Sequence, residues 1–181
     1  MDGVGTGGCG GVVGALLPNA YNVSVKFRVY VETSVISYLT GRPSRDPTVL
    51  AHQQLTQQWW NEGRSAYELY ISEYVTAEAS QGDPDAARQR MAALDGLPEI
   101  ATNSEVEMLA GVLIERCALP SNSRLDALHL AISAVQGMDL LLTWNFKHLA
   151  NAIAILKAEA VCRQCGFEPP RIITPLQMIG E

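Results

Sequence analysis

The sequence predicts an α/β domain in three layers (α/β/α), with a central, mostly parallel sheet of four or five strands. Short apolar runs rich in β-branched and aromatic residues alternate with longer stretches of helical spacing. Strands that alternate with helices form βαβ units, which build parallel sheets. One run is almost wholly apolar, as expected for a central strand covered on both faces. The five runs are residues 25–32, 68–72, 98–102, 139–143 and 171–174.

Capping signals predict the first two helices. Residues 33–39 follow the first strand and predict a short helix, which Thr33 or Ser34 is able to cap. The Asp-Pro pair at 46–47 combines an N-cap acid with proline at the first helical position. This pair predicts a second helix that ends near Asn61.

The next two helices follow the second strand. Ser72 ends that strand and is a candidate cap for a helix that contains Glu78. A second Asp-Pro pair, at 83–84, opens a helix that runs to Leu94. The chain then enters the short third strand.

Three helices are predicted in the second half of the chain. Asn or Ser at 103–104 caps a helix through Cys117. A further helix is opened by Asp126 and ends at Gly137, just before the fourth strand. The last helix covers about 150–165 and precedes the fifth strand.

Composition and length indicate one globular domain. The 181 residues are 48% hydrophobic and 18% charged, which is typical of a folded protein that is not embedded in a membrane. No uninterrupted apolar stretch is long enough to cross a bilayer. Residues 1–22 are Gly-rich and predict a flexible extension, so the domain is expected over 24–178.

The net charge of −6 argues against a protein that holds nucleic acid mainly through phosphate contacts. It suits an enzyme whose acids bind a metal while a local basic rim holds a phosphate backbone. Scattered surface charge is an equally good interpretation of each basic residue. The candidates for the rim are Arg42, Arg45, Arg124 and Lys147.

The four cysteines indicate a reducing compartment. Cys162 and Cys165 form a lone CxxC, and no second ligand pair has the spacing of a structural zinc site. A redox motif of the thioredoxin type would lie on an early strand-to-helix turn, whereas this pair ends a helix. We therefore expect reduced thiols and a cytoplasmic protein.

Acidic residues recur where strands end and helices begin. Glu32 closes the first strand, Glu78 lies just past the second, and Asp126 opens its helix. A polar fourth residue, Asn145, follows the fourth strand. Strand ends and adjacent helix starts share one edge of a parallel sheet, where ligands bind. Carboxylates gathered at one edge repel one another unless they hold a cation, so the pattern predicts a metal-dependent active site.

The same segments resemble PIN-domain nucleases, and within them the bacterial branch of VapC-like ribonuclease toxins of type II toxin–antitoxin pairs. The resemblance spans about residues 27–175. It is carried by an ordered set rather than by one motif. The set is Val31-Glu32-Thr33-Ser34, the acid after the second strand, Asp126-Ala127-Leu128 and the segment Leu142-Thr143-Trp144-Asn145-Phe146.

The resemblance implies an endoribonuclease that hydrolyses RNA phosphodiester bonds with Mg²⁺ or Mn²⁺. It places the catalytic set on Glu32, Glu78, Asp126 and Asn145, with the first three as metal ligands. The small hydroxyl residue that supports the first acid falls on Thr33 or Ser34. The implied partners are an RNA substrate, a small antitoxin protein and a second copy of the chain in a homodimer.

Two positions depart from the family pattern. Glu32 stands where Asp is usual, so its longer side chain must retract by another rotamer. Asn145 is neutral where Asp is frequent, so the site charge is nearer −3 than −4. These departures leave a second hypothesis open, a catalytically weak or inactive PIN-like module that binds RNA or protein. A phosphatase or other metal hydrolase is a third.

Several neighbouring residues have ordinary structural interpretations. Taken alone, Glu78 would be a surface acid, and Glu73 is a rival for its role. His129 could face the site, but a satisfied, partly buried histidine is the favoured interpretation. Asp139 is expected to be structural because it starts the fourth strand. Trp144 is expected to end a buried strand, and Trp60 is the aromatic residue expected at the surface.

Overall fold

The computed structural model describes residues 26–117, 124–145 and 152–179. The predicted Gly-rich extension at 1–22 and the basic candidate Lys147 lie outside the described residues.

The central sheet has five strands in the order β3-β2-β1-β4-β5, and all neighbouring strands are parallel. The predicted parallel sheet of four or five strands is thereby confirmed. β1 lies in the middle, where Tyr30 pairs with Tyr70 of β2 and with Leu141 of β4. The strands are β1 (Arg28–Val31), β2 (Glu68–Ser72), β3 (Glu99–Ile100), β4 (Leu140–Leu142) and β5 (Arg171–Ile173).

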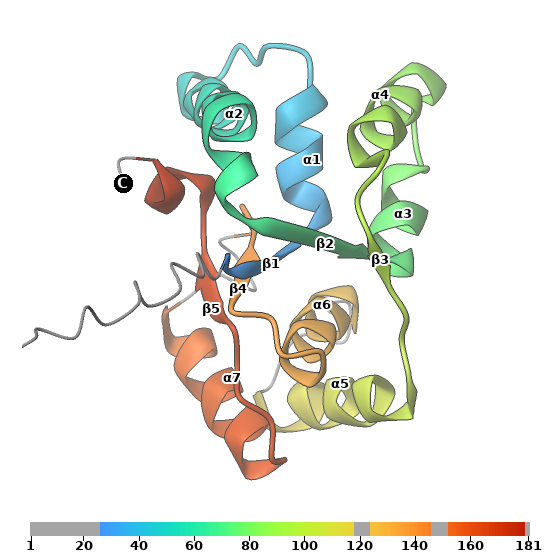
Figure 1. Cartoon of the computed structure of the whole chain (residues 1–181), viewed down its shortest axis with the longest axis vertical. Helices are drawn as coiled ribbons and strands as arrows, with labels where there is room; N and C mark the ends of the chain where they lie inside the picture. Colours follow the sequence, from blue (N-terminus) through green and yellow to red (C-terminus); the bar gives the residue numbers. More distant parts are fainter. Residues whose placement is uncertain (1–25, 118–123, 146–151, 180–181) are drawn as a thin grey trace, which may run out of the picture.

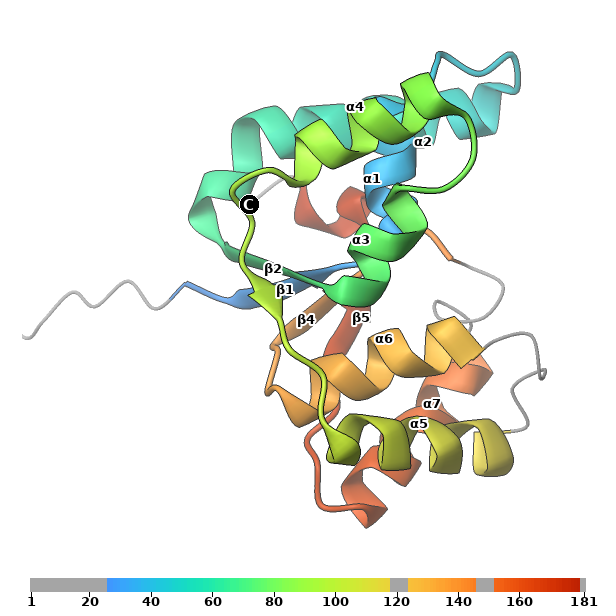
Figure 2. The ribbon, with the colours of Figure 1, turned by 90° about the vertical axis from the view of Figure 1, so that its right-hand side faces the viewer.

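Helices cover both faces of the sheet, which confirms the three-layer prediction (Figures 1 and 2). One layer contains α1 (Thr33–Thr40), α2 (Pro47–Gln58), α3 (Glu73–Ala79) and α4 (Pro84–Leu94). The other layer contains α5 (Ser104–Cys117), α6 (Arg124–Val135) and α7 (Ala152–Gln164). Short helical turns complete the described chain: η1 (Trp59–Gly63), η2 (Arg64–Ala66) and η4 (Pro175–Met178).

Both Asp-Pro pairs start helices as predicted. The Asp46 carboxylate accepts from the backbone N–H groups of Thr48 and Val49, at 2.8 and 3.2 Å. Asp83 accepts from Ala86 N at 2.9 Å. The prediction for α1 was wrong: the cap is Glu32, because its backbone is extended and its side chain accepts from Ser34 N. Thr33 is already the first helical residue.

The end of α2 differs from the prediction in a way that buries an expected surface residue. The α-helix ends at Gln58, and the wider π turn η1 carries the chain to Gly63. This turn directs Trp60 inward, where it is 8% exposed. The guanidinium of Arg64 lies over its ring, 4.6 Å from the centroid. The expected exposed aromatic is therefore a core residue.

Within the described residues, no helix has both the length and the apolar character that a membrane span needs. The inward face predicted for α5 is confirmed by the burial of Val106, Leu109, Ala110 and Leu113.

Candidate metal centre

Three of the predicted site residues lie at the carboxyl edge of the sheet. Glu32 directly follows β1, and Asn145 lies three residues after the end of β4. Helix α6 runs back from this edge, because its far end contacts the start of β1: Arg28 Nη1 donates to Gln136 O at 2.9 Å. Asp126, in the first turn of α6, therefore lies at the carboxyl edge as well.

The Glu32 carboxylate is buried and held by hydrogen bonds from two elements. It is 6% exposed. Oε1 accepts from Ser34 N at 3.1 Å, and Oε2 accepts from Thr143 Oγ1 at 2.8 Å. The Ser34 hydroxyl also donates to Oε2. The side chain is thus folded back over the first turn of α1.

The second carboxylate, Glu78 of α3, receives two donors. Thr33 Oγ1 donates to Oε2 at 2.6 Å, and His129 Nε2 lies 3.0 Å from the same oxygen. Burial raises the pKa of the Glu78 carboxyl, but the hydrogen bonds from His129 and Thr33 outweigh this effect. The net pKa lies below its ordinary value of 4.5, so Glu78 is ionised at neutral pH.

Asp126 is joined to this pair through Asn145. Asn145 Nδ2 donates to Asp126 Oδ1 at 2.7 Å. The backbone N–H of Asn145 donates to Thr143 Oγ1 at 2.9 Å, and that hydroxyl in turn donates to Glu32. A continuous chain of hydrogen bonds therefore connects Asp126 to Glu32.

The ligand atoms fit a small divalent ion. One atom each from Glu32, Glu78 and His129 lies within 4.8 Å of the other two. Two oxygens bound to one Mg²⁺ lie at most about 4.2 Å apart, twice the usual bond length. A shift of a few tenths of an ångström in each Glu side chain would close that difference. Asp126, although described, is outside the 4.8 Å group.

Sequence reasoning missed three buried polar residues that support the site. Tyr30, Ser72 and Thr143 lie in or directly after strands and are fully buried. Thr143 binds Glu32, while Tyr30 and Ser72 bind each other and, through Tyr30, His129. Their signal in the sequence is a polar residue inside or at the end of an apolar strand run.

Two neighbouring acids, Glu73 and Asp139, lie outside the cluster. Glu73 is exposed and accepts a hydrogen bond from the Thr102 hydroxyl instead of joining the cluster. Asp139 caps the start of the sheet, where its Oδ2 accepts from Arg28 N at 2.7 Å, which confirms its structural role.

Three candidates for the basic rim lie in the described chain. Arg124 forms an ion pair with Glu107 at 2.8 Å. Arg42 and Arg45 are exposed on the loop between α1 and α2.

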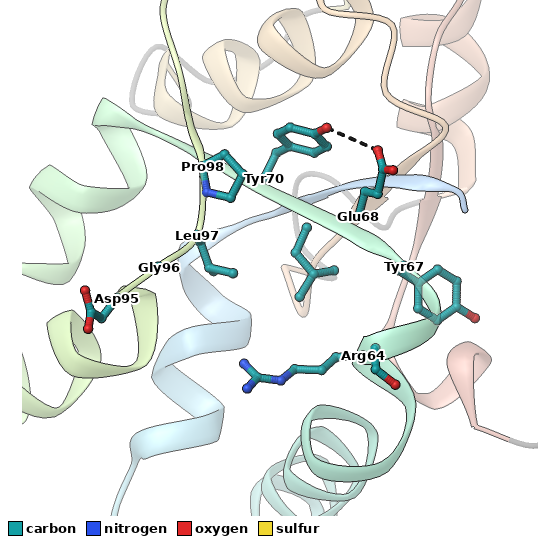
Figure 3. Close-up of a pocket in the computed structure, with 10 residues that line it drawn as sticks. Arg64, Tyr67, Glu68, Tyr70, Asp95, Gly96, Leu97 and Pro98 are labelled. Carbon is teal, nitrogen blue, oxygen red and sulfur yellow. Dashed lines mark hydrogen bonds between the residues drawn. The ribbon is translucent and has the colours of Figure 1, made fainter. Parts of the chain in front are cut away.

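A separate pocket of about 420 Å³ lies away from these acids (Figure 3). It is formed by residues before and within β2 and by residues 95–98, which precede β3. Both segments are at the amino edge of the sheet. Arg64, Tyr67, Glu68 and Tyr70 line it, and none of the predicted site residues does.

Replacing Glu78 with glutamine is expected to make the free energy of unfolding depend less on pH in the acidic range. Because folding lowers the pKa of Glu78, its ionised form stabilises the folded chain above about pH 4.5. This contribution is lost as the pH falls through the lowered pKa of Glu78 in the folded chain. In urea unfolding with a chelator present, the wild type should exceed Glu78→Gln in stability at pH 7. The gap should narrow below pH 4.5; a gap that widens there contradicts the assignment.

No family model and no curated protein matches the sequence. Among solved structures, the chain is similar to one in the VapBC2 complex of Rickettsia felis bound to a DNA fragment from its promoter. The sequence identity is 13% and the TM-score is 0.49. The similarity covers 82% of this chain and 98% of that one. A likeness at this level carries no functional conclusion for this chain.

Proposed function

We propose that this chain is a metal-dependent endoribonuclease of the PIN type, which hydrolyses RNA phosphodiester bonds with Mg²⁺ or Mn²⁺. One observation carries the proposal. The carboxylate of Glu32, at the cap of α1, meets that of Glu78, near the end of α3. Hydrogen bonds through Asn145 and Thr143 tie Asp126 to Glu32. Like charges at such distances are stabilised by a cation, and oxygen ligands favour a hard one.

Glu32, Glu78 and Asp126 are the residues that would hold the ion, directly or through water. A divalent ion bound there supplies charge neutralisation at the phosphate and lowers the pKa of the attacking water. The hydrogen bonds to Glu32 and Glu78 fix these carboxylates before an ion arrives. Such preorganisation removes a cost that flexible acids would otherwise carry.

Glu78 fits the role of ligand better than that of general base. A base is most effective when its pKa is close to the working pH. Hydrogen bonds from Thr33 and His129 instead move the pKa of Glu78 downward. A carboxylate that remains ionised suits a divalent cation.

Asn145 contributes through its amide rather than through charge. Its Nδ2 donates to Asp126, which fixes one oxygen of that carboxylate and orients the other. A fourth carboxylate in this place would repel Asp126 instead. The neutral residue is therefore compatible with a three-carboxylate centre.

Arg42 and Arg45 are the basic residues that suit contact with the RNA backbone. Both are exposed on the loop at the other end of α1, about 12 Å along this eight-residue helix from its Glu32 cap. Phosphate contacts of this kind orient a substrate without reading its sequence.

The toxin role, the antitoxin and the homodimer remain predictions from the sequence resemblance. A short neighbouring reading frame that encodes a DNA-binding start and an amphipathic tail would support them. Co-expression of the two frames should then relieve any growth defect that this chain alone causes.

Cleavage of an RNA panel tests the proposed activity. Wild-type protein with Mn²⁺ or Mg²⁺ should cleave, and EDTA should abolish the cleavage. Asp126→Ala should lower the rate about 10- to 100-fold, because it removes one carboxylate and leaves Asn145 without its acceptor. Asp85→Ala is the matched control, since Asp85 is an exposed acid paired with Arg88 on α4.

The outcomes separate the three functional hypotheses. Cleavage that persists in EDTA, or an Asp126→Ala variant that cleaves at the wild-type rate, contradicts the metal mechanism. RNA binding without cleavage in either metal favours the inactive binding module. Turnover of small phosphate esters without dependence on polymer length favours a phosphatase.

A further inference from the structure

The side chain of His129 is buried beside the acidic cluster and contacts it through one nitrogen. It is 1% exposed. Its Nε2 lies 3.0 Å from Glu78 Oε2, and its Nδ1 lies 2.8 Å from the Tyr30 hydroxyl. That hydroxyl also lies 2.7 Å from Ser72 Oγ. The sequence favoured a satisfied, partly buried histidine; the ring is instead fully buried, beside the candidate metal centre.

The direction of each hydrogen bond in this series follows from the Glu78 carboxylate, the acceptor at its end. Ionised Glu78 can only accept, so His129 Nε2 carries the proton. Nδ1 of a neutral ring is then an acceptor, and Tyr30 must donate to it. Burial raises the pKa of the Tyr30 phenol far above its ordinary value, so this proton is retained. Ser72 then donates to the Tyr30 oxygen, so that every donor proton between Ser72 and Glu78 has an acceptor.

The opposite direction leaves groups unmatched. For His129 to bind a metal, Nε2 must lose its proton and its hydrogen bond to Glu78. Nδ1–H would then donate to Tyr30, and Tyr30 would donate to Ser72. The Ser72 hydroxyl proton would need another acceptor, and the described residues supply none for it. A buried donor without an acceptor costs about 1–3 kcal/mol.

Both donors to Glu78 meet at one of its oxygens. Thr33 and His129 bind Oε2, and Oε1 receives no hydrogen bond from the described residues. Glu78 is on a seven-residue helix and its side chain is 27% exposed, so it would otherwise move among solvent-facing rotamers. The two donors therefore hold the carboxylate with Oε1 as the oxygen left for an ion.

We infer that the Ser72–Tyr30–His129 chain is a positioning device. It keeps His129 as a donor to Glu78 rather than a metal ligand, and so keeps the centre an all-oxygen site selective for hard divalent ions. This inference rests on the proposed metal-dependent function. A centre with a free imidazole would favour Zn²⁺, whereas carboxylate oxygens suit Mg²⁺ and Mn²⁺.

The first test needs no metal. Nitrogen-15 NMR of the ring nitrogens reports the tautomer, and the chain has three histidines, so assignment by substitution is simple. In metal-free wild type, His129 should be the Nε2–H tautomer. Tyr30→Phe removes the donor to Nδ1 but keeps Glu78 as the acceptor, so the Nε2–H tautomer should persist and only the Nδ1 resonance should shift. An Nδ1–H tautomer in the wild type overturns the inference.

The second test is calorimetric titration of the full chain with MnCl₂ and with ZnCl₂. Tyr30→Phe should weaken Mn²⁺ binding about 10-fold and should shift the Mn²⁺-to-Zn²⁺ preference toward Zn²⁺. His129→Gln keeps an amide donor that can reach Glu78 and should retain most of the Mn²⁺ affinity. If His129 were a ligand, His129→Gln would lose that affinity.

Ser133→Ala is the matched control for lost stability. Ser133 is buried and its hydroxyl donates to the backbone oxygen of His129 at 2.7 Å, so its removal does not touch the ring. Mn²⁺ affinity should be unchanged in this variant. Equal losses of Mn²⁺ affinity in Ser133→Ala and Tyr30→Phe would mean that the Ser72–Tyr30–His129 hydrogen bonds have only a structural role, and would overturn the inference. Absence of Mn²⁺ binding by the wild type would overturn the proposed function and the part of this inference that concerns metal selectivity. The NMR result would still decide the tautomer of His129.

Discussion

Glutamine in place of Glu32 is expected to lower metal-dependent RNA cleavage about 10³-fold. Glu32 is the most buried carboxylate of the cluster and belongs to the group of ligand atoms within 4.8 Å. Asp126 lies outside that group, which is why its replacement should have the smaller effect. The measurement is the single-turnover cleavage rate at saturating Mn²⁺, because binding differences are then removed.

The substitution also tests how the carboxylate is held. Glu32 accepts from Ser34 N, from the Ser34 hydroxyl and from Thr143. The amide nitrogen of glutamine cannot accept, so at least one buried donor loses its partner. We expect a stability loss of about 1–3 kcal/mol, which leaves most molecules folded. The rate must therefore be corrected for the folded fraction.

Two controls make the Glu32 result specific. Glu32→Asp keeps the charge and a good helix cap, so it should recover much of the lost rate. Glu62→Gln makes the same chemical change at an exposed acid of η1 and should cleave like the wild type. Full activity of Glu32→Gln would remove Glu32 from the metal centre.

Elements with strong local signals could be predicted almost to the residue. β2 and α4 occupy the predicted ranges, and the Asp83-Pro84 pair marks the start of α4 through neighbouring residues alone. The predicted side-chain cap by Ser72 is absent, because its hydroxyl pairs with Tyr30 instead. The predicted end of α2 was less accurate. Its continuation into a π turn depends on how Trp59 and Trp60 pack in the core, which local spacing does not encode.

The candidate site could be predicted as an edge but not as a set of contacts. Acids after strands identify the carboxyl edge because parallel strands share it. Which atoms meet there depends on side chains from separate elements. Glu78 meets His129 across 51 positions of sequence, and Tyr30 meets His129 across 99. Hydrogen bonds at such separation follow from the register of the sheet, which a single sequence does not give.

The cap of α1 shows why the role of one residue was misjudged. Thr33 and Ser34 are both good caps by residue type. The strand ends one residue earlier than expected, at Val31, so the extended residue before the helix is Glu32. Capping and the proposed metal binding then draw on the same carboxylate. The first turn of α1 places the N–H of Ser34 where it orients a ligand.

Alanine in place of Trp144 is expected to cost about 3–5 kcal/mol of folding free energy, the largest stability loss among these variants. Trp144 is 4% exposed, and its ring stacks on His52 with centroids 4.2 Å apart. Its Nε1 donates to Thr56 at 2.7 Å. The ring thus joins the end of β4 to α2. Urea unfolding at neutral pH measures this loss. It amounts to about a third of the free energy of unfolding of a typical domain, which is about 5–15 kcal/mol.

The same variant decides whether Trp144 serves the core or stacks RNA bases. A core residue should lose stability in Trp144→Ala and regain most of it in Trp144→Phe, which restores the ring face but not the bond to Thr56. The backbone N–H that donates to Ser34 survives in both variants, so Glu32 keeps its support. Cleavage per folded molecule should therefore fall far less than in Glu32→Gln. A stability loss below about 1 kcal/mol, together with weakened RNA binding, would instead make the ring a base-stacking surface.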